Sequence, residues 1–353
     1  MTARRSGSMA QSITATVAAL AFLYFFRGVL VPLVLALFLA GLVHALLRFI
    51  GSRSPGAPHW AILSLVAMIV IAGAASVFLV VGQGAAGLVH EAPRLVDRID
   101  ATLLDIGRAL GLSRPLQLAS ISDGISLPQV AGSAAASLGG VLSALILIVT
   151  YFGFIMVGRP RVRQRLAKLS TTGEGANRLD AVIERIVGDV QTYLWVQTVT
   201  GLIIAGSSWL VMAAIGLDNA LFWTVILFLL CYIPIIGVTV GSVVPALFAL
   251  LQFSSWWQAA VIFAGIQLAA TIVGNFIYPR MQAQTQNIDP VATLFAIAFW
   301  GFLWGIVGAF LAVPLTLIVM MICAQFPRTR WFAILLSNDG NPDFPGSRKG
   351  AAV

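Results

Sequence analysis

The sequence predicts an all-α, polytopic membrane protein, and two observations carry that prediction. The residues A, V, I, L, M, F, W, Y and C make up 59% of the 353 residues, while only 10% are charged. Ordinary soluble domains have about 25% charged residues, so this chain has too few charges to cover the surface of a soluble fold. The uncharged residues are also grouped in runs of membrane-spanning length, which disordered chains lack.

Uncharged runs between ionisable residues mark the candidate spans, because a span needs about 20 mostly apolar residues. The first half of the chain contains four such runs, and a fifth opens the second half. Two longer runs follow, one of 61 residues and one of 38 residues. In chain order, these runs are 6–26, 28–47, 60–82, 136–158, 190–217, 219–279 and 290–327.

Basic residues of the connecting segments predict that both termini face the cytoplasm. With the N-terminus inside, 16 of the 21 Lys and Arg residues lie on the cytoplasmic side, as the positive-inside rule requires. The opposite orientation would invert that ratio. We therefore expect an N-in, C-in protein of the bacterial inner membrane.

The spans and connecting segments give a predicted division of the chain. Residues 83–135 form an extracytoplasmic region whose apolar residues recur at helical spacing opposite a charged face, which is typical of an amphipathic helix on the bilayer or on a neighbour. Residues 159–190 form a basic and amphipathic cytoplasmic segment. The remaining parts are three N-terminal spans in 1–82, a fourth span in 136–158, a C-terminal transport body in 191–327 and a polar cytoplasmic tail in 328–353.

Two hydrophobic blocks of the transport body, 219–252 and 291–325, are interrupted by proline and glycine. Each block has the length of two short spans, and folds as either two spans or a re-entrant hairpin. Broken helices free backbone groups that need partners inside the protein or water, and such interrupted pairs point to a transporter's binding site. Close helix packing is the alternative role of the glycines. The predicted functional breakers are Pro234, Gly237, Gly305, Gly308 and Pro314.

Polar residues between these blocks are the other candidates for substrate binding or gating. Gln267, Thr271 and Asn275 recur every four residues, so they share one helix face. This face either lines a route for a hydroxylated or cationic substrate or joins helices by hydrogen bonds. Arg280 and Asp289 form either a gating pair or two separate interface features. Asp289 precedes a proline, which favours a helix N-cap, and Arg280 is most simply a cytoplasmic anchor.

Several functions are excluded by the motifs that the sequence lacks. It contains no GxxxxGK[ST] sequence for ATP, no HExxH and no GxSxG, and its two cysteines lie in separate apolar runs. We therefore predict no catalytic residues, no metal site, no cofactor and no disulfide. Nucleic acid is not expected as a partner, because the net charge of +8 follows from the basic cytoplasmic segments.

Three motifs resemble the autoinducer-2 exporter family of permeases. They are CYIPIIGVTVGSVVPAL from Cys231 to Leu247, GNFIYPRMQAQTQNIDP from Gly274 to Pro290, and GFLWGIVGAFLAVPL from Gly301 to Leu315. The resemblance covers most of 11–330 and implies about eight membrane segments. It further implies a secondary permease, since some members export autoinducer-2 and others carry out sodium/proton exchange.

The resemblance also assigns individual residues to family motifs. Pro234 and Gly237 match an Ile-Pro-x-x-Gly turn, and Gly274 and Pro279 match the element before the polar loop. A Gly-x-x-Gly element followed by proline is matched by Gly305, Gly308 and Pro314. Many members have proline directly after the Ile-Pro-x-x-Gly turn, whereas this chain has Val238. The Asn-Ile-Asp-Pro and Trp-rich stretches indicate a distinct subgroup, so the substrate of the named exporter does not transfer with the motifs.

These observations lead to one principal hypothesis and two alternatives. The principal hypothesis is an exporter of a small polar solute such as autoinducer-2, or of an ion, that works by alternating access without ATP. The first alternative is a sodium/proton antiporter of the same family. The second is a scaffold or interaction protein that acts through 83–135. Small residues on the membrane helices also predict a homo-oligomer.

Overall fold

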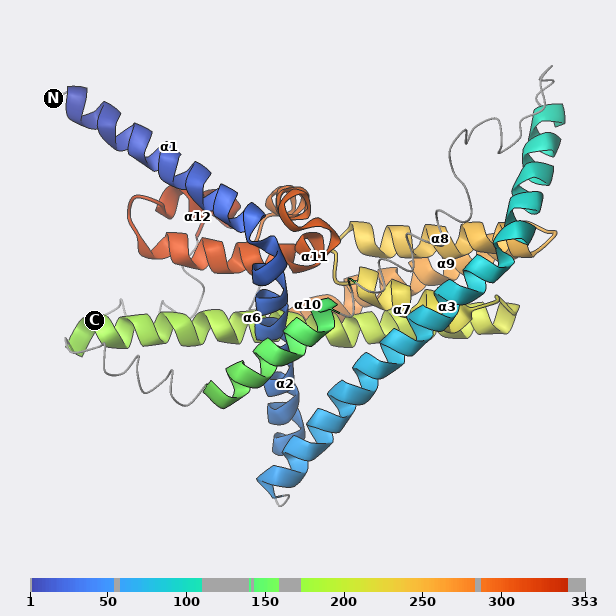
Figure 1. Ribbon diagram of the computed structural model, residues 1–353, viewed down its shortest axis with the longest axis horizontal. Helices are drawn as coiled ribbons and strands as arrows, with labels where there is room; N and C mark the ends of the chain where they lie inside the picture. The colour runs from blue at the N-terminus through green and yellow to red at the C-terminus, as the bar shows by residue number, and fades with distance from the viewer. Residues whose placement is uncertain are drawn as a thin grey trace. The chain divides into compact units, whose positions relative to one another are not determined.

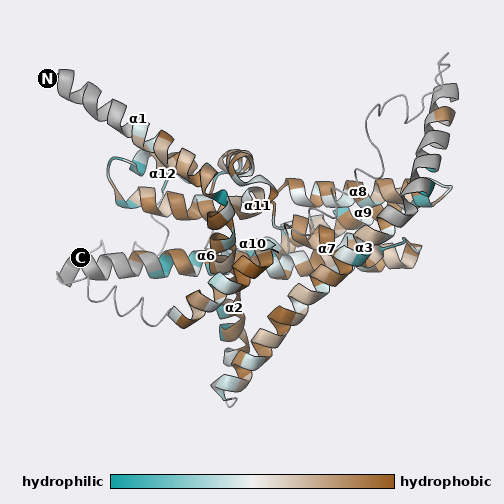
Figure 2. Ribbon diagram, in the orientation of Figure 1, coloured by the Kyte–Doolittle hydropathy of each residue, from teal (hydrophilic) through white to brown (hydrophobic). Residues whose placement is uncertain are grey.

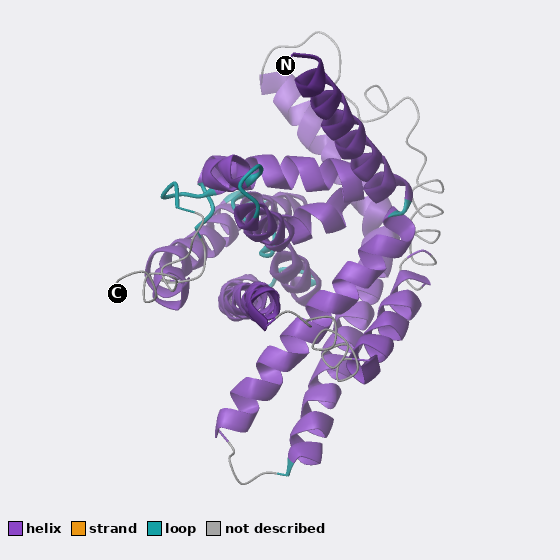
Figure 3. Cartoon of the chain, turned by 90° about the vertical axis from the view of Figure 1, so that its left-hand side faces the viewer, coloured by secondary structure: helices purple, strands orange, loops and turns teal. Residues whose placement is uncertain are grey.

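The computed structural model describes residues 2–53, 58–109, 140, 143–158, 173–282 and 287–341. Apart from one isolated bridge between Ile288 and Ser337, these residues form helices, turns and loops (Figures 1 and 3). The all-α fold class is therefore confirmed. The helices are α1 Thr2–Phe25, α2 Arg27–Arg53, α3 His59–Ala109, α6 Gly173–Ile215, α7 Ala220–Leu230, α8 Ile236–Gln252, α9 Trp257–Ile272, the π-helix η1 Val273–Ile277, α10 Tyr278–Gln282, α11 Pro290–Gln325 and α12 Arg330–Leu336.

The chain divides into two compact units. The first comprises Met1–Arg48, Ala144–Trp195 and Gln284–Val353, and the second comprises Phe49–Ser143 and Val196–Ala283. Each interrupted block lies in one unit, because α11 belongs to the first unit and α7 and α8 belong to the second.

Five helices are long and apolar enough to cross a membrane: Arg27–Arg53, Trp60–Leu88, Glu184–Ile215, Trp257–Met281 and Pro290–Gln325. Figure 2 shows hydrophobic residues over long stretches of α2 and α3. Four shorter apolar helices accompany them, at Thr14–Phe25, Ser143–Gly158, Ala220–Leu230 and Ile236–Gln252. The protein is therefore a multi-pass membrane protein.

Helix α3 joins two regions that the sequence separates. It runs without interruption from His59 to Ala109, through the predicted span and into the predicted amphipathic region. Part of that region, 110–139, lies outside the described residues, as does the whole basic run 159–172. Arg98, on the extension of α3, donates hydrogen bonds from Nη1 to the Leu251 and Gln252 carbonyls at 2.7 and 2.9 Å. The extension of α3 is thereby attached to the C-terminal end of α8.

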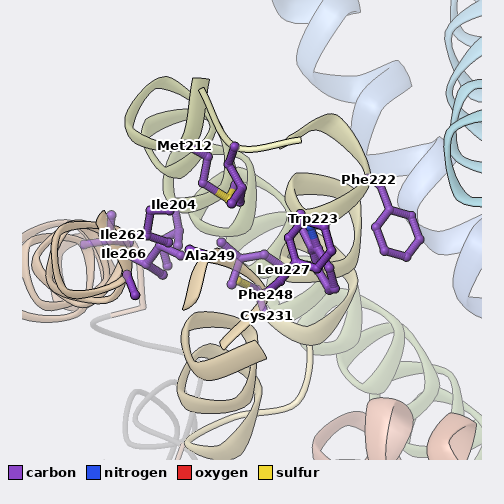
Figure 4. Close-up of a cluster of buried hydrophobic side chains, with 13 residues drawn as sticks. Ile204, Met212, Phe222, Trp223, Leu227, Cys231, Phe248, Ala249, Ile262 and Ile266 are labelled. Carbon is purple, nitrogen blue, oxygen red and sulfur yellow. The ribbon is translucent and has the colours of Figure 1, made fainter. Parts of the chain in front are cut away.

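A hydrophobic cluster holds α6, α7, α8 and α9 together in the second unit (Figure 4). Trp223 of α7 packs against Phe248 of α8 with ring centroids 5.2 Å apart. Leu227, Ile262 and Ile266 are fully buried in the same cluster. This packing fixes α7 and α8 on α6 and α9, and so holds the break between α7 and α8 against α6.

Candidate transport site

The first interrupted block folds as a helical hairpin of short arms. α7 has 11 residues and α8 has 17, so at 1.5 Å per residue they are about 16 and 26 Å long. Both are shorter than the hydrocarbon core of a bilayer, which is about 30 Å thick. The two helices pack against each other. The block therefore folds as two short helical arms that pack against each other.

The break between α7 and α8 begins with a 3₁₀ turn, which is followed by a residue without a backbone N–H donor. Tyr232 and Ile233 donate to the carbonyls three residues before them, at 3.3 and 2.8 Å, which is the pattern of a 3₁₀ turn. Pro234 then has no N–H to continue the series. Ile235 follows with a φ of 66° and a ψ of −55°, and Ile236 donates to the Pro234 carbonyl at 2.7 Å, which is the geometry of a rare and strained γ-turn.

Gly237 is the residue that lets α8 start so close to α7. Its backbone N–H donates to the Ile233 carbonyl at 2.9 Å. A Cβ at this position would coincide with the carbonyl oxygen of Leu230. The sequence prediction that Pro234 and Gly237 flank a tight turn is thus confirmed, and the steric reason for the glycine is an approach between two backbones.

Two polar side chains of α6 meet the break. Gln197 donates from Nε2 to the Cys231 carbonyl, and the Thr198 hydroxyl lies 2.6 Å from the Tyr232 hydroxyl. Gln197, Cys231 and Tyr232 are all buried. These contacts give polar partners to a segment that has left the helix, which apolar surroundings require.

One oxygen at this site has no partner. The Oε1 of Gln197 is buried and accepts no hydrogen bond from any of the residues that the structure describes. The other buried polar residues farther along α6 differ, since the hydroxyls of Thr200 and Ser208 donate to carbonyls one turn earlier, at 2.7 and 2.6 Å. An unsatisfied buried acceptor costs about 1–3 kcal/mol. A bound donor or cation would remove that cost.

The second interrupted block, α11, is also a hairpin. Its helix breaks at Gly305, which has a φ of 66° and a ψ of −149°. Trp300 donates from Nε1 to the Thr316 hydroxyl at 3.1 Å, although residues 16 positions apart along a straight helix are about 24 Å apart. The arms 290–304 and 306–325 therefore fold back on each other.

Different constraints explain the two predicted glycines of α11. A Cβ at Gly305 would meet nothing within 4 Å, so that position needs glycine for its φ of 66° and ψ of −149°, a backbone region that other residues hardly adopt. A Cβ at Gly308 would coincide with the Trp300 carbonyl oxygen, so that position needs glycine for space. Pro314 is fully buried in the second arm. Within the same unit, Trp304 of the first arm donates from Nε1 to the Leu23 carbonyl of α1 at 3.0 Å.

The predicted polar stripe forms successive side-chain to backbone hydrogen bonds along α9 and η1. Thr271 donates from its hydroxyl to the Gln267 carbonyl at 2.7 Å, and Asn275 donates from Nδ2 to the Thr271 carbonyl at 2.9 Å. Thr271 and Asn275 are exposed, and Gln267 is half-buried. Asn275 lies in the π-helix, a wide turn that occurs frequently at functional sites. The role of this stripe in binding remains a prediction.

Asp289 caps α11, as the Asp-Pro pair predicts. Its Oδ1 accepts hydrogen bonds from the backbone N–H groups of Val291 and Ala292 at 2.8 and 3.2 Å. Arg280 is an exposed residue of α10. Asp289 belongs to the first unit and Arg280 to the second. Their gating pair therefore stays a prediction.

Sequence reasoning missed the α6 side of the site. Gln197 and Thr198 lie in the uncharged block 190–217, which was assigned only as a span. One signal was present, because Gln191, Thr192, Gln197, Thr198 and Thr200 give this half of the block an unusually polar composition. Polar residues in a membrane segment point to a function. Their partner at the hairpin, however, is fixed only by the fold.

Comparison with known proteins identifies the family. The model of the AI-2E family transporter matches residues 13–328. The chain belongs to this family. It is 25% identical over 319 residues to the AI-2 transport protein TqsA of Escherichia coli K12, which covers 89% of this chain and 91% of TqsA.

Other relatives of this AI-2E family member share its length. A Haemophilus influenzae protein is 24% identical over 335 residues, covering 92% of this chain and 95% of the relative. The Escherichia coli K12 protein PerM is 20% identical over 324 residues, covering 88% and 91%. The similarity thus extends over the whole membrane region, including both hairpins, and the resemblance inferred from the three motifs is confirmed.

Proposed function

We propose that this AI-2E family member is a secondary permease for a small polar solute, with its transport site at the tip of the α7–α8 hairpin. The observation that carries the proposal is the unsatisfied Gln197 oxygen beside the break in the helix. Binding sites of secondary transporters form where broken helices leave backbone groups and polar side chains together near the bilayer midplane.

The position of the tip in the membrane follows from helix α6. Its apolar segment Glu184–Ile215 is long enough to span a bilayer, and the positive-inside rule puts its start in the cytoplasm. Gln197 and Thr198 lie near the middle of that segment. Since they contact Cys231 and Tyr232, we place the tip of the hairpin near the middle of the membrane.

Both ends of the hairpin then lie on the extracytoplasmic side. Gln252, the last residue of α8, accepts a hydrogen bond from the Asp218 backbone N–H at 2.8 Å and donates to the Gly216 carbonyl at 3.0 Å. The loop before α7 and the end of α8 are thereby fastened together. We propose re-entrant hairpins at 219–252 and 291–325 in an inner-membrane protein of about eight segments. We further propose that this protein works by alternating access as a homo-oligomer.

The groups at the tip also favour a second candidate function, ion-coupled exchange. Gln197 Oε1 is an acceptor, and the C-terminal end of α7 carries the negative end of its helix dipole. Acceptors alone attract a cation or the hydroxyl donors of a solute. We therefore retain sodium/proton exchange as the alternative to solute export.

The two candidates are tested with purified protein in liposomes. We expect Gln197→Leu to reduce autoinducer-2 transport at least tenfold, because it removes both the free acceptor and the donor to Cys231. Gln258→Leu is the matched control, since Gln258 also has a buried, unpartnered Oε1 but lies in the first turn of α9. Wild-type transport by Gln197→Leu would refute the site.

A second variant separates solute export from cation exchange. Gln197→Glu places a negative charge at the tip, which would strengthen the binding of a cation. For an exchanger, we expect the sodium concentration at half-maximal activity to fall by about tenfold or more, the effect of one favourable charge interaction of about 1.4 kcal/mol. For a solute permease without cation binding, the variant loses transport and gains no sodium dependence.

A further inference from the structure

The second unit contains a cavity that is widely open to the surface and separate from the hairpin tip. It has a volume of about 370 Å³ and lies between the outer part of the apolar segment of α3, the last turns of α6 and the start of α7. Gln83 of α3, Trp209 of α6 and Asn219, just before α7, contribute to its lining. Cavities of roughly 300–1,000 Å³ are typical of small-molecule sites. The cavity is therefore large enough for a small solute.

The wall between α3 and α7 is held by a close contact. Phe222 packs directly against Gly84, where a Cβ would collide with the phenylalanine side chain. The Phe222 ring also makes an edge contact with Trp223, with centroids 5.0 Å apart. In Figure 4, Phe222 lies at the margin of the hydrophobic cluster whose centre includes Trp223 and Leu227. One wall of the cavity is thus part of the packed core.

Asn219 presents an amide that its own helix does not use. It is the N-cap residue of α7, yet its side chain makes no cap hydrogen bond, and its φ is 55°. The carbonyl of Asn219 accepts from the Trp223 N–H at 3.2 Å. Asparagine is among the few residues that adopt the left-handed conformation readily. Gly87 of α3 leaves room beside the amide, since a Cβ there would be 3.5 Å from Asn219 Oδ1.

The chemistry of the lining selects the class of ligand. No charged side chain is among the described residues that line the cavity, so neither an anion nor a cation meets an opposite charge there. The amides of Gln83 and Asn219 each supply donors and an acceptor, which match the hydroxyl groups of a polyol. The Trp209 side chain is 38% exposed and gives an apolar surface for carbon-bound hydrogens.

We propose that this cavity binds a small, neutral, polyhydroxylated solute, with its hydroxyls on Gln83 and Asn219 and its carbon frame against Trp209. Under the N-in orientation, the ends of the apolar segments Trp60–Leu88 and Glu184–Ile215 both face the extracytoplasmic side. The cavity is then an outer site that the transported solute occupies on release or capture. This inference deepens the proposed permease function and rests on it for the solute's route.

The test measures binding to the purified full-length protein in detergent, with D-ribose as the neutral polyol probe. Isothermal titration should detect ribose, while tetramethylammonium and acetate, the cationic and anionic probes, should give no signal. Asn219→Gly keeps the left-handed backbone but removes the amide, and Gln83→Leu removes the second amide. Each should weaken ribose binding about fivefold to tenfold, the effect of losing one neutral hydrogen bond.

Matched variants keep the test independent of folding and of transport. Trp209→Phe should weaken ribose binding, whereas Trp256→Phe, at an exposed tryptophan outside the lining, should not. All variants should melt within a few degrees of the wild type. Gln197→Leu should still bind ribose although it loses transport, so the failures of the two proposals are distinguishable. Absent ribose binding, unchanged affinity in Asn219→Gly and Gln83→Leu, or preferred binding of a charged probe would each overturn the inference.

Discussion

The α7–α8 hairpin and the α11 hairpin obtain the hydrogen-bond partners at their helix breaks in different ways. The first breaks over several residues and takes its polar partners from α6, through Gln197 and Thr198. The second breaks at the single residue Gly305 and closes with a hydrogen bond between its own arms, from Trp300 to Thr316. A break that depends on a neighbour and leaves Gln197 Oε1 unsatisfied is suited to a ligand. A break that is closed by a hydrogen bond between its own arms is suited to a structural element.

The two hairpins should respond alike, and most strongly, to a methyl group at their closest backbone contact. Gly237→Ala and Gly308→Ala each place a Cβ on a carbonyl oxygen, which backbone atoms cannot avoid by a rotamer change. We expect losses of about 3 kcal/mol or more, measured as the yield of monodisperse protein and its melting temperature. Gly206→Ala, with nothing within 4 Å of its Cβ, is the control. Wild-type melting of either variant would contradict the close contact.

Substitutions at the residue with positive φ in each hairpin should change the stability of the protein in opposite directions. Gly305→Ala forces alanine into a backbone region that is essentially restricted to glycine and should destabilise the protein by about 1–3 kcal/mol. Ile235→Gly relieves the strain at a φ of 66° and loses little burial, because Ile235 is 57% exposed. It should stabilise the protein by about 1 kcal/mol. Melting temperatures in one detergent compare the two, and shifts of the same sign would show that the tips are not strained as described.

Removing one polar contact from each hairpin should separate stability from transport. Trp300→Phe deletes the N–H that reaches Thr316, and Tyr232→Phe deletes the hydroxyl beside Thr198. Each should cost about 1 kcal/mol of stability. Only Tyr232→Phe should also slow transport in liposomes, because only that contact lies at the proposed site. Equal transport in the two variants would remove the functional distinction between the hairpins.

The smallest effect is expected at the outer end of the first hairpin. Arg98→Leu removes two hydrogen bonds to the last carbonyls of α8 and a positive charge at a helix C-terminus. We expect a loss of about 0.5–1 kcal/mol, read from the melting temperature, with faster proteolysis of the segment after α8. Arg94→Leu, also at an exposed position on α3, should have no effect. A matching loss in Arg94→Leu would assign the effect to charge alone.

Prediction from sequence worked where the signal is local. Long uncharged runs predict apolar helices, because spanning segments must be both long and free of charge. The Asp-Pro pair predicts the cap at Asp289, because capping involves only the next few N–H groups. The breaks at Pro234 and Gly305 are also local, because proline lacks a donor and glycine tolerates a positive φ.

The sequence did not predict contacts between residues that lie far apart in the chain. Gln197 and Cys231 are 34 residues apart, and no spacing rule joins a glutamine in one helix to a carbonyl freed in the next. The cavity lined by Gln83, Trp209 and Asn219 was missed for the same reason, since its residues come from three segments. The sequence likewise does not predict the position of Arg280 relative to Asp289, because the two residues lie in separate units.

The sequence by itself determined that this chain is an α-helical membrane protein of the AI-2E transporter type, and it indicated the breaks at Pro234 and Gly305, although the predicted breakers Gly308 and Pro314 lie inside a continuous helical arm. It did so because apolar content, helix length and backbone breakers are properties of single segments. Only the tertiary structure decided that both interrupted blocks fold back as hairpins and that Gln197 meets the first break. Those results depend on packing between helices, where a side chain's partner is set by the fold rather than by its neighbours in sequence.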